Sequence, residues 1–182
     1  VFLEKYVARA RHIEVQAFGD GVGQVVSLGE RDCSAPRRNQ KVIEESPAPN
    51  LSDRLRNQLC STAEALLASV QYRNAGTVEF IFDADTEAFY FLEDNTRLQV
   101  EHGVTEEVWG VDLVECMVRQ AAGDMPPLQD WRQQLSPRGH SMQVRLYAED
   151  PNNGFMPSPG LISAVNLPEA QGIRLESWVQ SG

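Results

Sequence analysis

The sequence predicts an α+β fold with mainly antiparallel strands, and three observations support it. Two β-rich runs, residues 13–18 and 25–28, are joined by a glycine-rich turn. A second pair of β-rich runs, residues 77–82 and 89–95, flanks a polar turn, as in another hairpin. Between the two pairs, apolar residues recur at helical spacing. With 182 residues, of which 42% are hydrophobic and 23% charged, the chain is long enough to bury one sizeable core.

The turn between the first two runs is residues 19–23, with the sequence Gly-Asp-Gly-Val-Gly. Glycine-rich loops also bind phosphate, but this one lacks the Lys and Ser/Thr that follow in a P-loop. We therefore predict a hairpin turn. Residues 30–41 are polar and rich in arginine, without a clear period, and we predict a loop there.

A helix is predicted after Pro47 and Pro49, because Ser52 is a suitable N-cap. It extends to about residue 70 and carries one apolar stripe. The stripe consists of Leu55, Leu59, Ala63, Leu66, Leu67 and Val70.

Further helical sequence follows the second hairpin. We predict a helix that starts after Thr105 and is interrupted near Gly110. It resumes with Asp112 as N-cap and Glu115 at the capping-box position, and it ends at Gly123.

The remaining residues predict a junction and more strands. The stretch 125–137 is rich in Pro and Gln, and we interpret it as a subdomain junction. A strand is expected over residues 141–147 and further hairpins over 155–182. Because Val1 already begins an apolar run and residues 175–179 read as a strand without a partner, we expect a fragment cut from a larger fold.

Charge and cysteine content exclude several classes of function. The net charge is −10 and the isoelectric point about 4.7, so the chain repels nucleic acid and anionic membranes. No apolar run approaches the ~20 residues needed to span a bilayer. Cys33, Cys60 and Cys116 show no CxxC spacing, which favours reduced thiols in a cytoplasmic protein over a disulfide framework or a zinc site.

The second hairpin carries opposed acids. If its turn is symmetric about Thr86, the opposed pairs are Thr77–Asn95, Glu79–Glu93 and Ile81–Phe91. Two opposed carboxylates have Cβ atoms about 5 Å apart and repel each other, and surrounding aromatic residues strengthen that repulsion. Magnesium or manganese bound by Glu79, Glu93 and Asn95 removes it. The alternative is that both glutamates face water on an exposed face of the sheet.

A polar stripe continues beyond this hairpin. Arg97, Gln99 and Glu101 share their parity with Glu93 and Asn95, so an extended chain presents all five on one surface. Arginine binds a planar carboxylate or bicarbonate through two hydrogen bonds, and a neighbouring carboxylate can serve as a general base. A solvated strand edge is the alternative.

The run Glu93–His102 resembles the ExNxRxQVEH signature of biotin carboxylases, in the ATP-grasp superfamily. Other segments match that family in order, and together they cover nearly the whole chain. They are residues 4–7, 11–16, 30–34, 37–41, 76–80, 148–151 and 157–160. The resemblance implies a partial ATP-grasp lobe over residues 1–130, without its N-terminal part and glycine-rich lid. It also implies the start of the biotin carboxylase C-terminal subdomain over residues 136–182.

The resemblance further implies an ATP site with magnesium or manganese. The residues expected to bind ATP are Glu4, Lys5, Tyr6, Val7, His12, Asn39, Glu79, Leu92 and Glu93. Among them, the segment 4–7 and Leu92 lie near the adenine, and His12 contacts the ribose or phosphates. Glu79 and Glu93 bind the metal ion with help from Asn95.

The bicarbonate and biotin sites follow from the same resemblance. Bicarbonate is held by four residues, Lys41, Arg97, Gln99 and Val100. Glu101 is the base that deprotonates it, and Arg145 stabilises the enolate-like form of biotin. Lys41, Arg97, Glu101 and Arg145 are the expected catalytic set. Pro36 and Gly103 depart from the family, which commonly has glutamine and proline there.

The implied activity is ATP-dependent carboxylation of a carrier-bound biotin by bicarbonate. Residues 38–41, 47–51, 101–105 and 143–147 are most similar to urea carboxylase, part of urea amidolyase, in which urea becomes allophanate. The implied partners are a biotinylated carrier domain, a carboxyltransferase domain and a second copy in a homodimer. We expect the fragment alone to be inactive. Three alternatives stay open: an acyl-CoA carboxylase, another ATP-grasp carboxylate–amine ligase, and an inactive nucleotide-binding module.

Overall fold

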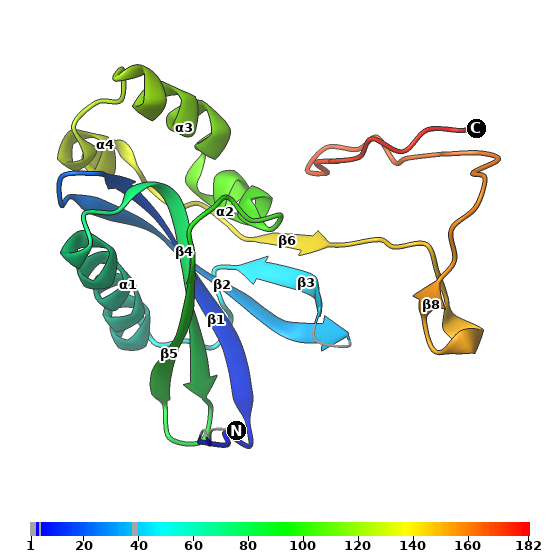
Figure 1. Ribbon diagram of the computed structural model, residues 1–182, viewed down its shortest axis with the longest axis horizontal. Helices are drawn as coiled ribbons and strands as arrows, with labels where there is room; N and C mark the ends of the chain where they lie inside the picture. Colours follow the sequence, from blue (N-terminus) through cyan, green and yellow to red (C-terminus); the bar gives the residue numbers. More distant parts are fainter. Residues whose placement is uncertain (1–2, 4, 38–39) are drawn as a thin grey trace. The chain divides into compact units, whose positions relative to one another are not determined.

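A computed structural model describes residues 3, 5–37 and 40–182, except the side chains of residues 36 and 37. The chain divides into two compact units, residues 1–145 and 146–182. The first contains a six-stranded antiparallel sheet in the order β5-β4-β1-β2-β3-β6 (Figure 1). Its strands are β1 (Ala10–Asp20), β2 (Val25–Arg37), β3 (Gln40–Ser46), β4 (Arg73–Asp83), β5 (Ala88–Asn95) and β6 (Ser141–Val144). Its helices are α1 (Asp53–Ser69), α2 (His102–Trp109), α3 (Leu113–Ala122) and α4 (Leu128–Gln134). The predicted α+β class is confirmed.

Alternation along β1 separates the core from a polar face. Ile13, Val15 and Ala17 are fully buried in the core cluster that contains the inner face of α1. The intervening Glu14 and Gln16 point to the opposite face, because successive side chains of a strand alternate. They are also fully buried. A strand that is buried on both faces and polar on one of them marks a buried polar site.

Helix α1 forms where the sequence predicts it. The Ser52 hydroxyl accepts a hydrogen bond from the Leu55 amide, as an N-cap does. Four stripe residues, Leu55, Leu59, Ala63 and Leu67, are buried. Leu66 and Val70 were also expected on the buried stripe, but they are 37% and 65% exposed. The buried residues of α1 are spaced four apart along one face of the helix. Leu66 lies beside that row, and Val70 lies just beyond the end of the helix.

The predicted loop over residues 30–41 is wrong, because β2 continues to Arg37 and β3 begins at Gln40. These strands could not be predicted from the spacing of apolar residues, because several of their buried residues are charged. Glu30 and Arg31 are both buried. The hairpin turn predicted before β2 is confirmed, with positive φ angles of 86° at Gly21 and 108° at Gly23, which glycine adopts without strain.

The second core cluster packs α3 and α4 against one end of the sheet (Figure 1). Phe18 and Trp131 meet edge to face there, with ring centroids 5.6 Å apart. Leu128 and Trp131 are buried, so the predicted junction at residues 125–137 contributes to this core. Strand β6 then pairs with β3, which continues the first unit to Arg145.

The caps of α3 are as predicted: Asp112 accepts from the Glu115 amide, and Gly123 ends the helix with φ of 75°. Helix α2 begins at His102 rather than after Thr105. The chain turns immediately before it, where the His102 amide donates to the Gln99 carbonyl.

The second unit has little regular structure. It contains β7 (Glu149–Asp150) paired with β8 (Met156–Pro157) and the short 3-10 helix Pro151–Asn153. The strand predicted over 141–147 ends at Val144, and most of the hairpin structure predicted over 155–182 does not form. Within the described part of the chain, every helix is too short or too polar to cross a bilayer.

Candidate active site

Three glutamates lie in a row across adjacent strands of the sheet. Glu14 on β1 is opposite Glu79 on β4, and Glu79 is opposite Glu93 on β5. Glu14 and Glu79 are 0% and 3% exposed, whereas Glu93 is exposed. The predicted pairs Glu79–Glu93 and Thr77–Asn95 are confirmed. Sequence reasoning missed Glu14 as a member of the row, although its alternation with Ile13 and Val15 was a signal for it.

The predicted pair Ile81–Phe91 is wrong. The register between β4 and β5 shifts by one residue after Glu79, so Ile81 lies opposite Tyr90. The shift leaves Leu92 as the extra residue of β5, which is the arrangement of a β-bulge. Leu92 and Ile81 both line the pocket described below. Ile81 was not predicted as a pocket residue.

Lys41 contacts the two buried acids of this row and a third carboxylate, Glu101. Its Nζ atom contacts the Glu14 carboxylate, and it lies 2.8 Å from Glu79 Oε1 and 2.7 Å from Glu101 Oε1. A β-bulge in β3 gives Lys41 its direction, because the pairing with β2 shifts between Ile43 and Lys41. One ammonium group is therefore shared by three carboxylates.

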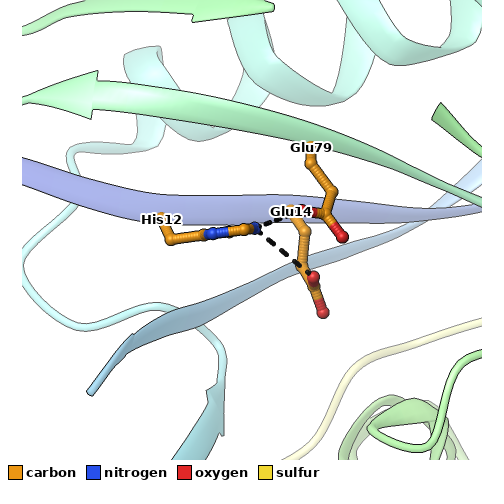
Figure 2. A group of neighbouring side chains, drawn as sticks. All are labelled: His12, Glu14 and Glu79. Atoms are coloured by element: carbon orange, nitrogen blue, oxygen red, sulfur yellow. Dashed lines mark ion pairs between the residues drawn. The ribbon is translucent and has the colours of Figure 1, made fainter. Parts of the chain in front are cut away.

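A histidine and two amides complete the surroundings of Glu79. His12 Nε2 lies 2.5 Å from Glu79 Oε2 and 3.9 Å from Glu14 Oε2 (Figure 2). The side-chain amides of Asn95 and Gln99 each donate to Glu79 Oε1 over 2.9 Å. Protein groups therefore already offset the repulsion at Glu79 that the sequence analysis assigned to a metal ion.

These contacts determine the charge states at the site. Burial raises the pKa of Glu79, but hydrogen bonds from His12, Lys41 and Gln99 lower it to about 2. Burial also raises the pKa of Glu101, and Lys41 more than reverses this, so that it lies below its usual range. For Lys41, burial lowers the pKa while Glu14, Glu101 and Glu79 raise it well above its ordinary value. Lys41, Glu79 and Glu101 are therefore all ionised at neutral pH.

We predict that acid weakens this cluster. The pKa values of Glu79 and Glu101 are lower in the folded than in the unfolded chain. The stability they contribute is thus present above the unfolded value of about 4.3 and is lost as the pH falls toward about 2. Hydrogen exchange of the β1 and β4 amides between pH 5 and 2.5 should show local protection that falls with pH. A Glu79→Gln variant should show a weaker pH dependence, and an unchanged dependence would contradict the assignment.

Arg31 pairs with Glu14 of this cluster from the interior of the protein, and sequence reasoning missed it. It is fully buried, and its Nε atom lies 2.5 Å from Glu14 Oε1. Its Nη1 atom donates to Gln16 Oε1 over 2.7 Å and to Thr105 Oγ1 on α2 over 2.9 Å. Glu14 therefore bridges Arg31 and Lys41, and the paired charges offset their burial.

Arg145 binds the other side of Glu101. Its Nη2 atom lies 2.9 Å from Glu101 Oε2, while Lys41 holds Oε1. Glu101 is 2% exposed. Glu101 therefore has a cation at each of its carboxylate oxygens.

One pocket of about 550 Å³ gathers most of the predicted site residues. Of the predicted residues, its walls include His12, Lys41, Glu79, Leu92, Glu93, Asn95, Arg97, Gln99, Val100, Glu101 and Arg145. Cys33, Ser34, Ala10, Arg11 and Ile81 also line it. Arg97 and Val100 are exposed, so the predicted bicarbonate residues form both the floor and the rim.

Other predicted ATP residues are not on this pocket. Lys5, Tyr6 and Val7 do not line it, and the Lys5 ammonium instead lies 2.5 Å from the Tyr90 hydroxyl. Glu4 and Asn39 lie outside the described residues.

The donor set fits a hard divalent cation. Asn95 Nδ2 donates to Glu79 Oε1 and, over 3.5 Å, to Glu93 Oε1, so the three side chains converge on one point. Carboxylate and amide oxygens are ligands that magnesium and manganese accept. Rotation of the Asn95 amide presents its oxygen to the same point.

Two family models match the chain. The ATP-binding domain of the carbamoyl-phosphate synthase L chain matches residues 1–128, and the biotin carboxylase C-terminal domain matches residues 143–182. The chain is 53% identical over its full length to urea amidolyase of Saccharomyces cerevisiae, of which it spans 10%. It is 50% identical over its full length to the methylcrotonoyl-CoA carboxylase α subunit of Glycine max, of which it spans 25%.

A solved structure shares the fold. The biotin carboxylase domain dimer of 2-oxoglutarate carboxylase from Hydrogenobacter thermophilus, in complex with MgADP, ADP and bicarbonate, superposes with a TM-score of 0.87 at 43% identity. The match covers 94% of this chain and 37% of that one. The chain therefore belongs to the family of the carbamoyl-phosphate synthase L chain ATP-binding domain, and its residues 143–182 match the biotin carboxylase C-terminal domain.

Proposed function

We propose that this chain supplies the bicarbonate and metal–ATP sites of a longer protein that carboxylates biotin at the expense of ATP. The observation that carries the proposal is the placement of Glu101 between Lys41 and Arg145, in the same pocket as Glu79 and Glu93. A base, two cations for an anion and a set of oxygen ligands for a metal ion are thereby brought together. These are the groups that activation of bicarbonate by ATP needs.

Lys41, Gln99, Arg97 and Val100 hold bicarbonate in this proposal. The anion competes with Glu101 for Lys41, which weakens the ion pair that depresses the pKa of Glu101. Glu101 then accepts the bicarbonate proton while a bicarbonate oxygen attacks the γ-phosphorus of ATP, giving carboxyphosphate and ADP. The carboxyl group then passes to N1 of biotin as its bond to the phosphate oxygen breaks, and inorganic phosphate leaves with the N1 proton. Arg145 stabilises the negative charge that develops on the biotin ureido oxygen.

Glu79, Glu93 and Asn95 would hold magnesium or manganese together with ATP. Such an ion neutralises charge on the transferring phosphoryl group. Leu92, with the neighbouring Ile81, offers the apolar wall that an adenine ring packs against. A carboxylate–amine ligase would share the metal ligands, but it has no use for the set formed by Arg97, Gln99 and Glu101.

We propose urea as the final acceptor, which makes the parent a urea carboxylase. The 53% identity to urea amidolyase supports this choice, and the 50% identity to methylcrotonoyl-CoA carboxylase makes an acyl-CoA the competing acceptor. A steady-state assay of the full-length protein with ATP and bicarbonate compares urea with acetyl-CoA and methylcrotonoyl-CoA. We expect urea, and neither CoA ester, to stimulate ATP cleavage. If a CoA ester stimulates it and urea does not, the acceptor is an acyl-CoA.

The remaining partners are a biotinylated carrier domain, a carboxyltransferase domain and a second copy of the chain. The domain dimer of the Hydrogenobacter protein supports the last of these. A cytoplasmic location is consistent with three free cysteines.

We predict that magnesium and ATP stabilise the protein through Glu79 and Glu93. The double variant Glu79→Gln, Glu93→Gln removes two charged ligands, so the rise in melting temperature on adding magnesium and a non-hydrolysable ATP analogue should be lost. The matched control is Glu107→Gln, an exposed acid on α2 that is outside the pocket. It should keep the full shift, and a double variant that also keeps it would contradict the metal assignment.

A further inference from the structure

Glu44 is a buried acid whose role the proposed reaction leaves open. Its side chain is 0% exposed, and its Oε1 atom lies 2.8 Å from Arg145 Nη2. The same nitrogen lies 2.9 Å from Glu101 Oε2. One guanidinium nitrogen is therefore shared between Glu101, which faces the pocket, and Glu44, which does not line it.

The sheet geometry creates this contact. Strand β3 pairs with β6 so that Glu44 lies opposite Gln143, and the Arg145 amide donates to the Val42 carbonyl over 2.9 Å. Arg145 is thus the diagonal neighbour of Glu44 on the same face, within reach of a long side chain. Strand β6 ends at Val144, so Arg145 emerges from the sheet with Glu44 beside its side chain.

The buried charge of Glu44 is stabilised by its contact with Arg145. A buried carboxylate is costly unless it is paired. Burial raises the pKa of Glu44, and the Arg145 guanidinium opposes that shift. Within residues 3, 5–37 and 40–182, the ion-pair partner of Glu44 is Arg145, and the negative Glu101 and Glu14 also act on it.

We propose that Glu44 is a positioning residue that holds Arg145 in place for biotin while Glu101 takes up a proton. The proposal rests on the proposed function. Protonation removes the charge of Glu101 and with it most of the attraction to Arg145. Glu44 remains as an anionic partner of the same nitrogen, so the guanidinium stays in position when biotin must be bound. Without Glu44, Arg145 loses the carboxylate that stays charged on the same nitrogen while Glu101 is protonated.

The variant Glu44→Gln in the full-length protein tests this. The ratio of biotin carboxylation to bicarbonate-dependent ATP cleavage should fall about tenfold or more, since a small displacement of a reacting group has an effect of that size. The loss should lie in kcat for biotin rather than in KM for ATP. Glu45→Gln is the matched control, because Glu45 is the next residue of β3 and points to the other face. It should leave the ratio unchanged.

A ratio in Glu44→Gln within about twofold of the wild-type value would overturn the proposal. Failure of the proposed function looks different, because the wild-type protein would then show no bicarbonate-dependent ATP cleavage at all.

A cycle with Arg145→Gln separates positioning from a general loss of stability. Arg145→Gln leaves Glu44 buried without its cation, so the melting temperature should drop. Adding Glu44→Gln to that variant should restore part of the loss and should not lower biotin carboxylation further. The contrary result is that Glu44→Gln slows biotin carboxylation by the same factor in the Arg145→Gln background as in the wild-type protein. Glu44 would then act independently of Arg145, and the proposal would fail.

Discussion

The Glu101→Gln variant of the full-length protein should lose bicarbonate-dependent ATP cleavage by a factor of about 10² to 10⁴, the usual contribution of a positioned base. Glutamine keeps the size of the side chain and can still accept a hydrogen bond from Lys41 or Arg145. It cannot accept the bicarbonate proton. The expected loss is therefore in kcat, and it should be measured as ADP release with and without bicarbonate.

The control for this variant is Glu107→Gln, which removes an equal charge from the exposed side of α2. Both variants should still bind MgATP, which is measured as the rise in melting temperature that MgATP causes. If Glu101→Gln cleaves ATP at the wild-type rate with the same dependence on bicarbonate, then Glu101 is not the base.

Lys41→Met should destabilise the domain by roughly 3–5 kcal/mol, the usual consequence of removing one partner from a buried ion pair. The Lys41 side chain is only 17% exposed, and it is shared by Glu14, Glu79 and Glu101. Removing it takes one cation away from each of three buried carboxylates. Hydrogen exchange of the β1, β3 and β4 amides measures the resulting local opening without requiring two-state unfolding.

Two comparisons test whether the loss comes from the acids. Arg54→Met removes a cation that is 67% exposed, and it should change protection by less than about 0.5 kcal/mol. Adding Glu79→Gln to Lys41→Met should recover part of the lost protection because it removes one of the repelling charges while Glu14 keeps the buried Arg31 paired. A double variant less stable than Lys41→Met would contradict this account.

The parts of the fold that follow simple periodicity were predictable. The cap at Ser52, four of the six stripe residues of α1 and the ends of α3 depend on local chemistry, and they were found where the sequence indicates. Strand β2 beyond Leu28 was not predictable in this way. Its inward residues Glu30 and Arg31 resemble a solvated loop until their partners on other strands are known.

The candidate site shows the same division. Opposition of Glu79 and Glu93 followed from counting residues across one hairpin. The cation that neutralises Glu79 comes from β3, two strands beyond its neighbour β1, and no local pattern relates Lys41 to it. The Ile81 pairing failed because a single bulge at Leu92 changes the register, and bulges leave no reliable mark in one sequence.

The most direct test is incorporation of labelled bicarbonate into biotin by the full-length protein. With magnesium, ATP and bicarbonate, we predict labelled carboxybiotin and one ADP for each carboxyl group transferred. No label should appear when ATP or magnesium is omitted, or in the Glu101→Gln variant. Unlabelled biotin in the presence of all substrates, or labelling that survives the loss of Glu101, would contradict the role assigned to this pocket.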